Sequence, residues 1–157
     1  MSYQNFEKAL ELAKQCDDYF THEPKTEDVI EFVEKQIDIK FSTQNKTFYK
    51  LLGYLSFFGV EIYGIYPDGD LKILAGNSFA SILYDRKHYN LPKEWLPIYF
   101  FDDGYYGYLD YSKLNEDGEP PVIMAIHNSK EFVVVERVAD DFGDFLLGLV
   151  ENQLGRQ

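Results

Sequence analysis

The sequence contains a single cysteine, Cys16, so the chain cannot close a disulfide bond on itself. Its three histidines, His22, His88 and His127, lie far apart, and none combines with Cys16 in a spacing typical of a zinc site. We therefore expect no bound metal ion and no other cofactor. The lack of disulfides also favours a reducing compartment, and the expected location is the cytoplasm.

Long apolar segments are absent as well. The chain has no stretch of about 20 uncharged apolar residues, which is the length that a membrane-spanning helix needs. Residues 1–7 carry neither the basic region nor the apolar region of a secretory signal peptide. The sequence thus predicts neither a membrane span nor a cleaved leader.

Basic residues are scarce. The chain has 15 lysines and arginines against 27 acidic residues, which gives a formal net charge of −12. A charge of this size repels phosphate backbones and anionic membrane surfaces, so we expect no direct binding to nucleic acid or membranes. Two interpretations of the excess remain: it serves solubility alone, or it forms a negative face that meets a positive partner.

Sequence motifs for catalysis are also missing. The chain has no GxSxG, HExxH or P-loop sequence. Residues 68–70, Asp-Gly-Asp, lack the further ligands and the glutamate of a calcium loop, so a turn explains them. Asp102 and Asp103 precede Gly104 and would point to opposite sides of an extended strand, which favours a turn over an acid–base pair. We predict that the protein is not an enzyme.

Helical periodicity dominates the first third of the chain, and short strand-like segments dominate the rest. The expected helices cover residues 3–19, 26–36, 43–57 and 77–90, and a final segment after residue 140 or 141. The expected N-caps are Thr26, Ser42 or Thr43, Asn77 or Ser78, and Asp140 or Asp141. The expected strands cover residues 60–66, 71–74, 96–101, 105–110, 122–127 and 132–138. Proline, aspartate and glycine at 67–69 predict a hairpin turn between the first two strands.

This order of elements predicts the fold class. Helices come first, strands with short connections follow and a helix closes the chain, so the elements do not alternate as in βαβ units. We predict a single α+β domain over residues 1–157. It should have a largely antiparallel central sheet of about six strands, packed against the N-terminal helices and a C-terminal helix. Residues 1–25 are expected to form an N-terminal helical extension and residues 26–153 the core.

Residues 99–111 combine seven aromatic residues with three acidic ones. Because strand side chains alternate, half of them can face the core, and the others would present tyrosines beside carboxylates, a composition typical of protein interfaces. Alternatively, the aromatic residues fill both faces of a sheet covered by helices. The candidate partner-binding face consists of Glu61, Tyr63, Asp68, Asp70, Asp102, Asp103, Tyr105, Tyr106 and Asp110.

Several motifs occur in an order that resembles the SUKH superfamily, which includes bacterial immunity proteins and a yeast regulator of cell-wall synthesis. They are the acidic helix at 28–34, the segment Phe48-Tyr49-Lys50-Leu51-Leu52, the strand 59–64 ending in Tyr-Gly, the Leu-Pro and apolar strand at 91–98 with Asp-Asp-Gly at 102–104, Tyr108-Leu109-Asp110, Pro121-Val122, and the closing segment 142–146. Together they span roughly residues 28–153.

The resemblance implies a SUKH-like domain without catalytic residues, most often encoded beside a polymorphic toxin that it binds and neutralises. Many such toxins are nucleases. A nuclease presents a basic surface to phosphate, and the acidic composition of this chain would suit that partner. The alternative that the resemblance implies is a regulatory or scaffold module related to the regulators of cell-wall synthesis.

Overall fold

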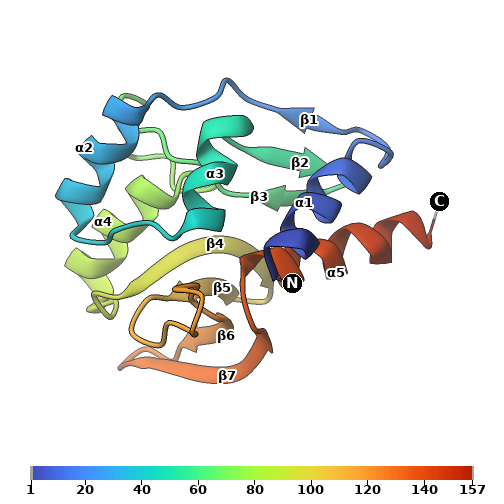
Figure 1. Ribbon diagram of the computed structural model, residues 1–157. Coiled ribbons are helices and arrows are strands. Elements are labelled where there is room, and N and C mark those ends of the chain that lie inside the picture. The colour runs from blue at the N-terminus through green and yellow to red at the C-terminus, as the bar shows by residue number, and fades with distance from the viewer. Residues whose placement is uncertain (1, 157) are drawn as a thin grey trace.

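The computed structural model describes residues 2–156. This part of the chain contains five helices and seven strands. The helices are α1 (Ser2–Ala13), α2 (Glu27–Ile37), α3 (Thr43–Leu51), α4 (Ser78–Tyr89) and α5 (Phe142–Leu154). The strands are β1 (Phe20–Thr21), β2 (Leu55–Phe57), β3 (Val60–Ile62), β4 (Trp95–Asp102), β5 (Tyr105–Asp110), β6 (Val122–His127) and β7 (Phe132–Ala139). All pairs between these strands are antiparallel, which confirms the predicted α+β fold (Figure 1).

The strands form two sheets, β1-β2-β3 and β4-β5-β6-β7, where the sequence predicted one sheet of about six strands. The two sheets meet where the backbone N–H of Tyr63, just after β3, donates to the carbonyl oxygen of Ile98 in β4 at 3.0 Å. Beside this contact, Pro97 has no N–H to offer, and its carbonyl oxygen accepts from the Ser78 hydroxyl of α4. The β3 and β4 ladders therefore do not merge.

Local capping chemistry sets the starts of four helices. The side chains of Thr26, Ser42, Asn77 and Asp141 accept hydrogen bonds from backbone N–H groups in the first turns of α2, α3, α4 and α5. These side-chain oxygens pair N–H groups that have no partner within the helix. The predicted caps are thereby confirmed.

The predicted helix over residues 43–57 is too long. It ends at Leu51, and Gly53 then takes a φ of +69°, a left-handed conformation that favours glycine. Leu55 and Phe57 continue as β2, with both side chains buried against the core. The hairpin is thus β2–β3, whereas residues 71–74 form turns in which Ile73 N–H bonds the carbonyl oxygen of Asp70. The predicted strand and hairpin at 71–74 are wrong.

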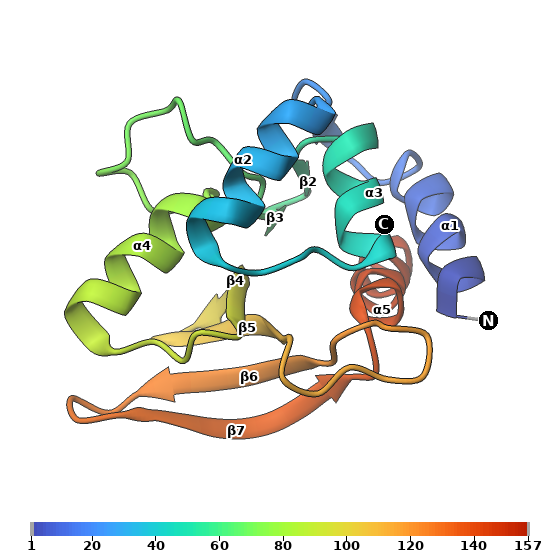
Figure 2. The same ribbon diagram turned by 60° about the vertical axis from the view of Figure 1, so that its left-hand side comes forward.

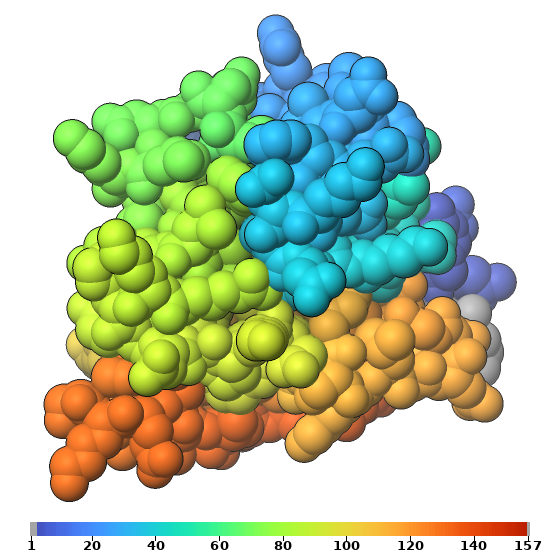
Figure 3. Space-filling view, turned by 90° about the vertical axis from the view of Figure 1, so that its left-hand side faces the viewer, coloured from blue at the N-terminus to red at the C-terminus, as the bar shows by residue number. Residues whose placement is uncertain are grey.

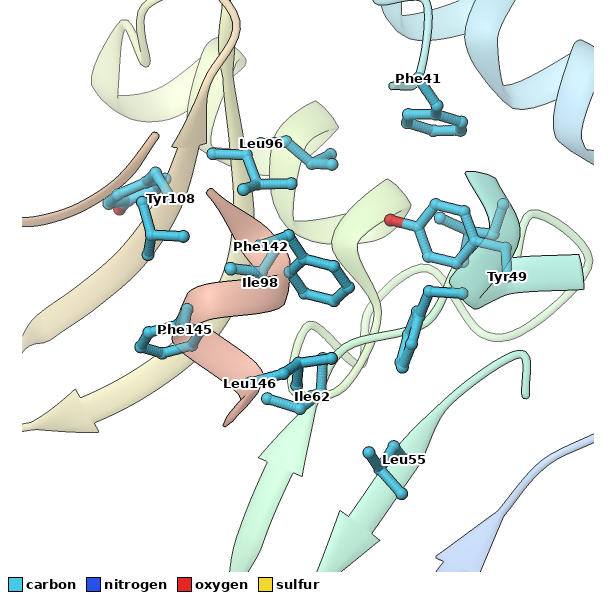
Figure 4. Packing of buried hydrophobic residues seen from close by; sticks show 14 of the residues in the cluster. Phe41, Tyr49, Leu55, Ile62, Leu96, Ile98, Tyr108, Phe142, Phe145 and Leu146 are labelled. Atoms are coloured by element: carbon cyan, nitrogen blue, oxygen red, sulfur yellow. The ribbon is translucent and has the colours of Figure 1, made fainter. Parts of the chain in front are cut away.

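The main core joins the helices to the larger sheet. Phe142 at the start of α5 packs against Phe6 of α1 and Phe48 of α3, with ring centroids 6.1 and 5.3 Å apart. Figure 4 shows Phe142, Phe145 and Leu146 of α5 among the other buried side chains of this core. Phe145, one turn later, contacts the rings of Tyr99 and Phe101 at 5.4 and 6.0 Å. One helix thereby links the N-terminal helices to β4. No helix within residues 2–156 has the length and apolar character to cross a membrane.

A buried polar junction holds α3, α5 and the segment between β5 and β6 together. Its centre is Gln44, whose side-chain Oε1 accepts from Gly143 N–H at 2.7 Å and whose Nε2 donates to Asp141 at 3.4 Å. The backbone N–H of Gln44 donates to the Glu119 carboxylate at 3.3 Å. Burial raises the pKa of Glu119. The junction consists of Gln44, Glu119, Asp141 and Gly143.

Strand β7 forms the open edge of the larger sheet, away from the helices (Figure 2). Its pairing with β6 shifts twice, so that Val135 and Val138 are extra residues on the β7 side. Such bulges bend the strand and strengthen its twist. Val133, Val134 and Val135 are exposed on this edge.

Candidate functional site

A groove of about 880 Å³ lies between α4, the end of β3 and the larger sheet. Its lining contains the seven aromatic residues Tyr63, Tyr84, Tyr89, Phe100, Tyr106, Tyr108 and Phe132. Three carboxylates, those of Glu61, Asp85 and Asp103, also line it, and no lysine or arginine does. The groove therefore combines broad apolar rings with uncompensated negative charge.

Regular secondary structure places most of these side chains. Tyr84, Asp85 and Tyr89 come from α4, which Asn77 caps at its start. Tyr106 and Tyr108 are two residues apart on β5 and so lie on the same face of the sheet. On the surface, α4 lies next to segment 66–77, and the turn between β6 and β7 lies below it (Figure 3).

Ring–ring contacts hold the walls of the groove in place. Phe100 packs on Tyr106 with ring centroids 4.9 Å apart, and Tyr108 packs on Phe132 at 6.1 Å. Both distances fall in the range of favourable aromatic pairs. The cavity is thus formed before any partner arrives.

Asp85 is the most perturbed carboxyl group of the groove. Burial raises its pKa from an ordinary 3.8 to about 6, while the charges of His127 and His88 lower it. Within residues 2–156 its carboxylate forms neither a hydrogen bond nor an ion pair. Burial is the main cause of the raised pKa values of Tyr63, Tyr106 and Tyr108, and the charge of Asp85 is a further cause. The Asp85 carboxylate therefore lies close to these phenols.

Two tyrosine hydroxyls in the groove are also without partners. Tyr63 and Tyr108 are only 5% and 2% exposed, yet neither hydroxyl makes a hydrogen bond within the described part of the chain. Burial raises the pKa of both groups, so they stay protonated at neutral pH. Both hydroxyl oxygens keep some exposure toward the groove, so a ligand bound there could form hydrogen bonds with them.

Glu61 is held on the groove wall by a neighbouring phenol. The Tyr54 hydroxyl donates a short hydrogen bond to its carboxylate. Burial is the main cause that raises the pKa of Tyr54 to about 12, and the hydrogen bond to Glu61 and the charge of Glu61 are further causes. This pair fixes one negative charge at the side of the cavity.

The groove brings together four of the nine residues that the sequence singled out: Glu61, Tyr63, Asp103 and Tyr106. Asp68, Asp70, Asp102 and Tyr105 lie outside its lining. Asp110 does not lie on an exposed face. It is 4% exposed, and its carboxylate accepts from the N–H and hydroxyl of Ser112 at 3.0 and 2.6 Å.

Sequence reasoning missed the contribution of α4, including Asp85. This helix has apolar and polar residues spread around it, because its first turns pack in the core and its last turns face the groove. A weak helical pattern with tyrosines at 84 and 89 was the only local signal. Within residues 2–156, no three His, Cys, Asp or Glu side chains are grouped so that they could hold a metal ion.

Two antiparallel sheets, a helical layer and an aromatic, acidic groove define a small α+β domain with a preformed cavity. The chain belongs to the SUKH_5 family, described as SMI1-KNR4 cell-wall, whose model matches residues 6–151. The resemblance to the SUKH superfamily is thereby confirmed, and it supports an interaction domain of the immunity or cell-wall-related kind. No curated protein matches the sequence.

Asp85→Asn should stabilise the protein at pH 7.5. The buried carboxyl keeps its proton up to a pKa of about 6, whereas the unfolded chain releases it near 3.8. Its ionisation therefore destabilises the fold as pH rises through this window. The difference corresponds to at most about 3 kcal/mol, and solvent screening of the partly exposed group reduces it to about 1 kcal/mol.

Urea denaturation at pH 7.5 and pH 4 measures this effect. The gain in unfolding free energy should be present at pH 7.5 and much smaller at pH 4, where the folded carboxyl is protonated and the unfolded one is only partly ionised. Asp68→Asn, in an exposed turn, is the matched control and should change stability by less than about 0.5 kcal/mol at either pH. An Asp85→Asn variant that is less stable at pH 7.5 would contradict the expectation.

Proposed function

We propose that this protein is a non-catalytic binding domain that acts in the cytoplasm as an immunity protein, neutralising a cognate toxin by binding it in and around the groove. The observation that carries the proposal is the lining of the groove, which has three carboxylates and seven aromatic rings but no lysine or arginine. Aromatic residues beside uncompensated charge suit a protein partner with a basic surface.

The overall charge supports the same partner. A net charge of −12 favours rapid encounter with a cationic protein and disfavours nucleic acid or anionic membranes. A nuclease toxin presents a basic surface to its phosphate substrate, so an acidic inhibitor can occupy that surface. Family membership supports an interaction domain of this kind.

Co-expression with the toxin encoded next to this gene tests the proposal. We expect cells to survive and the two proteins to copurify. Asp103→Lys should abolish protection and weaken the complex at least tenfold, because Asp103 lines the groove and is exposed. Glu116→Lys makes the same charge change at an exposed position outside the groove and should retain protection. No protection and no complex for the unaltered chain would refute the proposal.

A regulatory module is the second candidate, and the cell-wall description of the matched family favours it. In that case the groove would bind a host protein instead of a toxin. Deleting the gene in a strain that lacks any neighbouring toxin gene separates the two functions. A cell-wall phenotype in that strain would favour the regulatory role, and normal growth would favour immunity.

A further inference from the structure

We propose that the groove binds one arginine side chain of the partner, with its guanidinium group between the carboxylate of Asp85 and the hydroxyls of Tyr63 and Tyr108. This inference rests on the proposed partner-binding role of the groove and adds the chemistry that the groove recognises. It is carried by three polar groups that have no partner within residues 2–156 and that all line one cavity.

The three groups call for a ligand that donates hydrogen bonds and carries positive charge. The Asp85 carboxylate can only accept hydrogen bonds, and each phenol oxygen can accept one beside its own proton. Tyr63 and Tyr108 are almost fully buried, so water reaches their hydroxyls only from the groove. A guanidinium group has five N–H donors and no acceptor, which matches this set.

The aromatic walls favour arginine over lysine. A guanidinium is planar, is weakly hydrated and stacks on aromatic rings, whereas an ammonium is a compact and strongly hydrated charge. Phe100 and Tyr106 offer ring surfaces beside the carboxylates. The chain itself contains a cation–aromatic contact elsewhere, where Nζ of Lys25 lies 4.3 Å from the centre of the Tyr66 ring.

No internal cation already fills the position. The charges of His127 and His88 act on Asp85, but neither residue forms an ion pair with it in the described chain. His127 instead packs against the rings of Tyr89 and Phe132 at 4.9 and 4.8 Å. The negative charges of Glu61 and Asp103 on the same lining further favour a cation.

Titration of the whole protein with N-acetyl-arginine amide, followed by NMR chemical shifts of backbone amides, tests the inference. We expect a Kd of about 1 mM, which is reasonable for a ligand of this size, with the largest shifts in α4, β5 and residue 63. N-acetyl-citrulline amide has nearly the same shape without the charge and should bind at least tenfold more weakly. N-acetyl-lysine amide with a free ε-amine should bind several-fold more weakly than the arginine probe.

Variants of the protein separate a binding role from a structural one. Asp85→Asn should raise the Kd for the arginine probe at least tenfold although the variant remains folded. Tyr63→Phe should raise this Kd about threefold, because it removes one hydroxyl. Asp68→Asn, outside the groove, should leave binding unchanged. Equal binding of the arginine and citrulline probes, or unchanged binding to Asp85→Asn, would overturn the inference.

The two proposals can fail separately. If the arginine probe does not bind while the toxin complex forms and depends on Asp103, the arginine inference is wrong and the immunity function stands. If the probe binds as expected and the neighbouring toxin is not neutralised, the arginine site stands and the immunity function is wrong.

Discussion

Phe142→Ala should lower the free energy of unfolding by about 4 kcal/mol, the range seen when a large aromatic ring is removed from a core. Phe142 is 1% exposed, and its ring contacts Phe6 and Phe48 at centroid distances of 6.1 and 5.3 Å. The substitution would leave a cavity where α1, α3 and α5 meet. A small domain has a total stability of about 5–15 kcal/mol, so the loss is a large share of it.

Urea denaturation measures this loss, and the fluorescence of Trp95, the single tryptophan and a core residue, reports unfolding. Phe32→Ala is the matched control, because Phe32 is 49% exposed on α2 and should cost less than about 1 kcal/mol. Similar losses for the two variants would show that the Phe142 ring does not fill a tightly packed site.

Gln44→Met should cost about 3 kcal/mol, although it keeps the length of the side chain. The substitution removes the acceptor of Gly143 N–H and the donor to Asp141, and it leaves both partners buried. A buried polar group that loses its partner costs about 1–3 kcal/mol, and two such groups are affected here. The buried polar junction is therefore expected to be a stability determinant as strong as many apolar contacts.

Thermal or urea denaturation of Gln44→Met, together with hydrogen exchange at Gly143, tests this expectation. Gln36→Met, at an exposed position of α2, is the matched control and should change stability by less than about 0.5 kcal/mol. The Gly143 amide should exchange faster in the Gln44 variant alone. Unchanged stability and exchange would mean that the amide finds another partner.

The parts of the fold that neighbouring residues determine could be predicted from the sequence. The caps Thr26 and Asp141 act on N–H groups three residues away. The strands β5 and β6 have the predicted bounds because turn-forming residues mark their ends, Gly104 before β5 and Pro121 and Asn128 on either side of β6. The region from 52 to 74 could not be predicted so well. Leu55 continues the helical spacing of α3, and only the left-handed Gly53 shows that the helix has ended.

The candidate site could be predicted only in part, for a similar reason. Tyr106 and Asp103 stand in an aromatic and acidic segment that is visible in the sequence. Asp85 becomes notable only when folding places it beside Tyr63 and Tyr108, which lie 22 and 23 residues away along the chain. Asp110 looked like a surface acid because the sequence does not show that Ser112 satisfies its carboxylate in a buried turn.

The twice-bulged edge strand β7 has a consequence for how the protein behaves at high concentration. An open strand with Val133, Val134 and Val135 exposed could serve as a template on which another chain adds a strand, the first step toward fibrils. The extra residues at 135 and 138 break the regular spacing of its backbone groups, and Glu136 and Arg137 place charge between them. Edge-to-edge growth would lose its register within a few residues, which protects the folded protein from self-assembly.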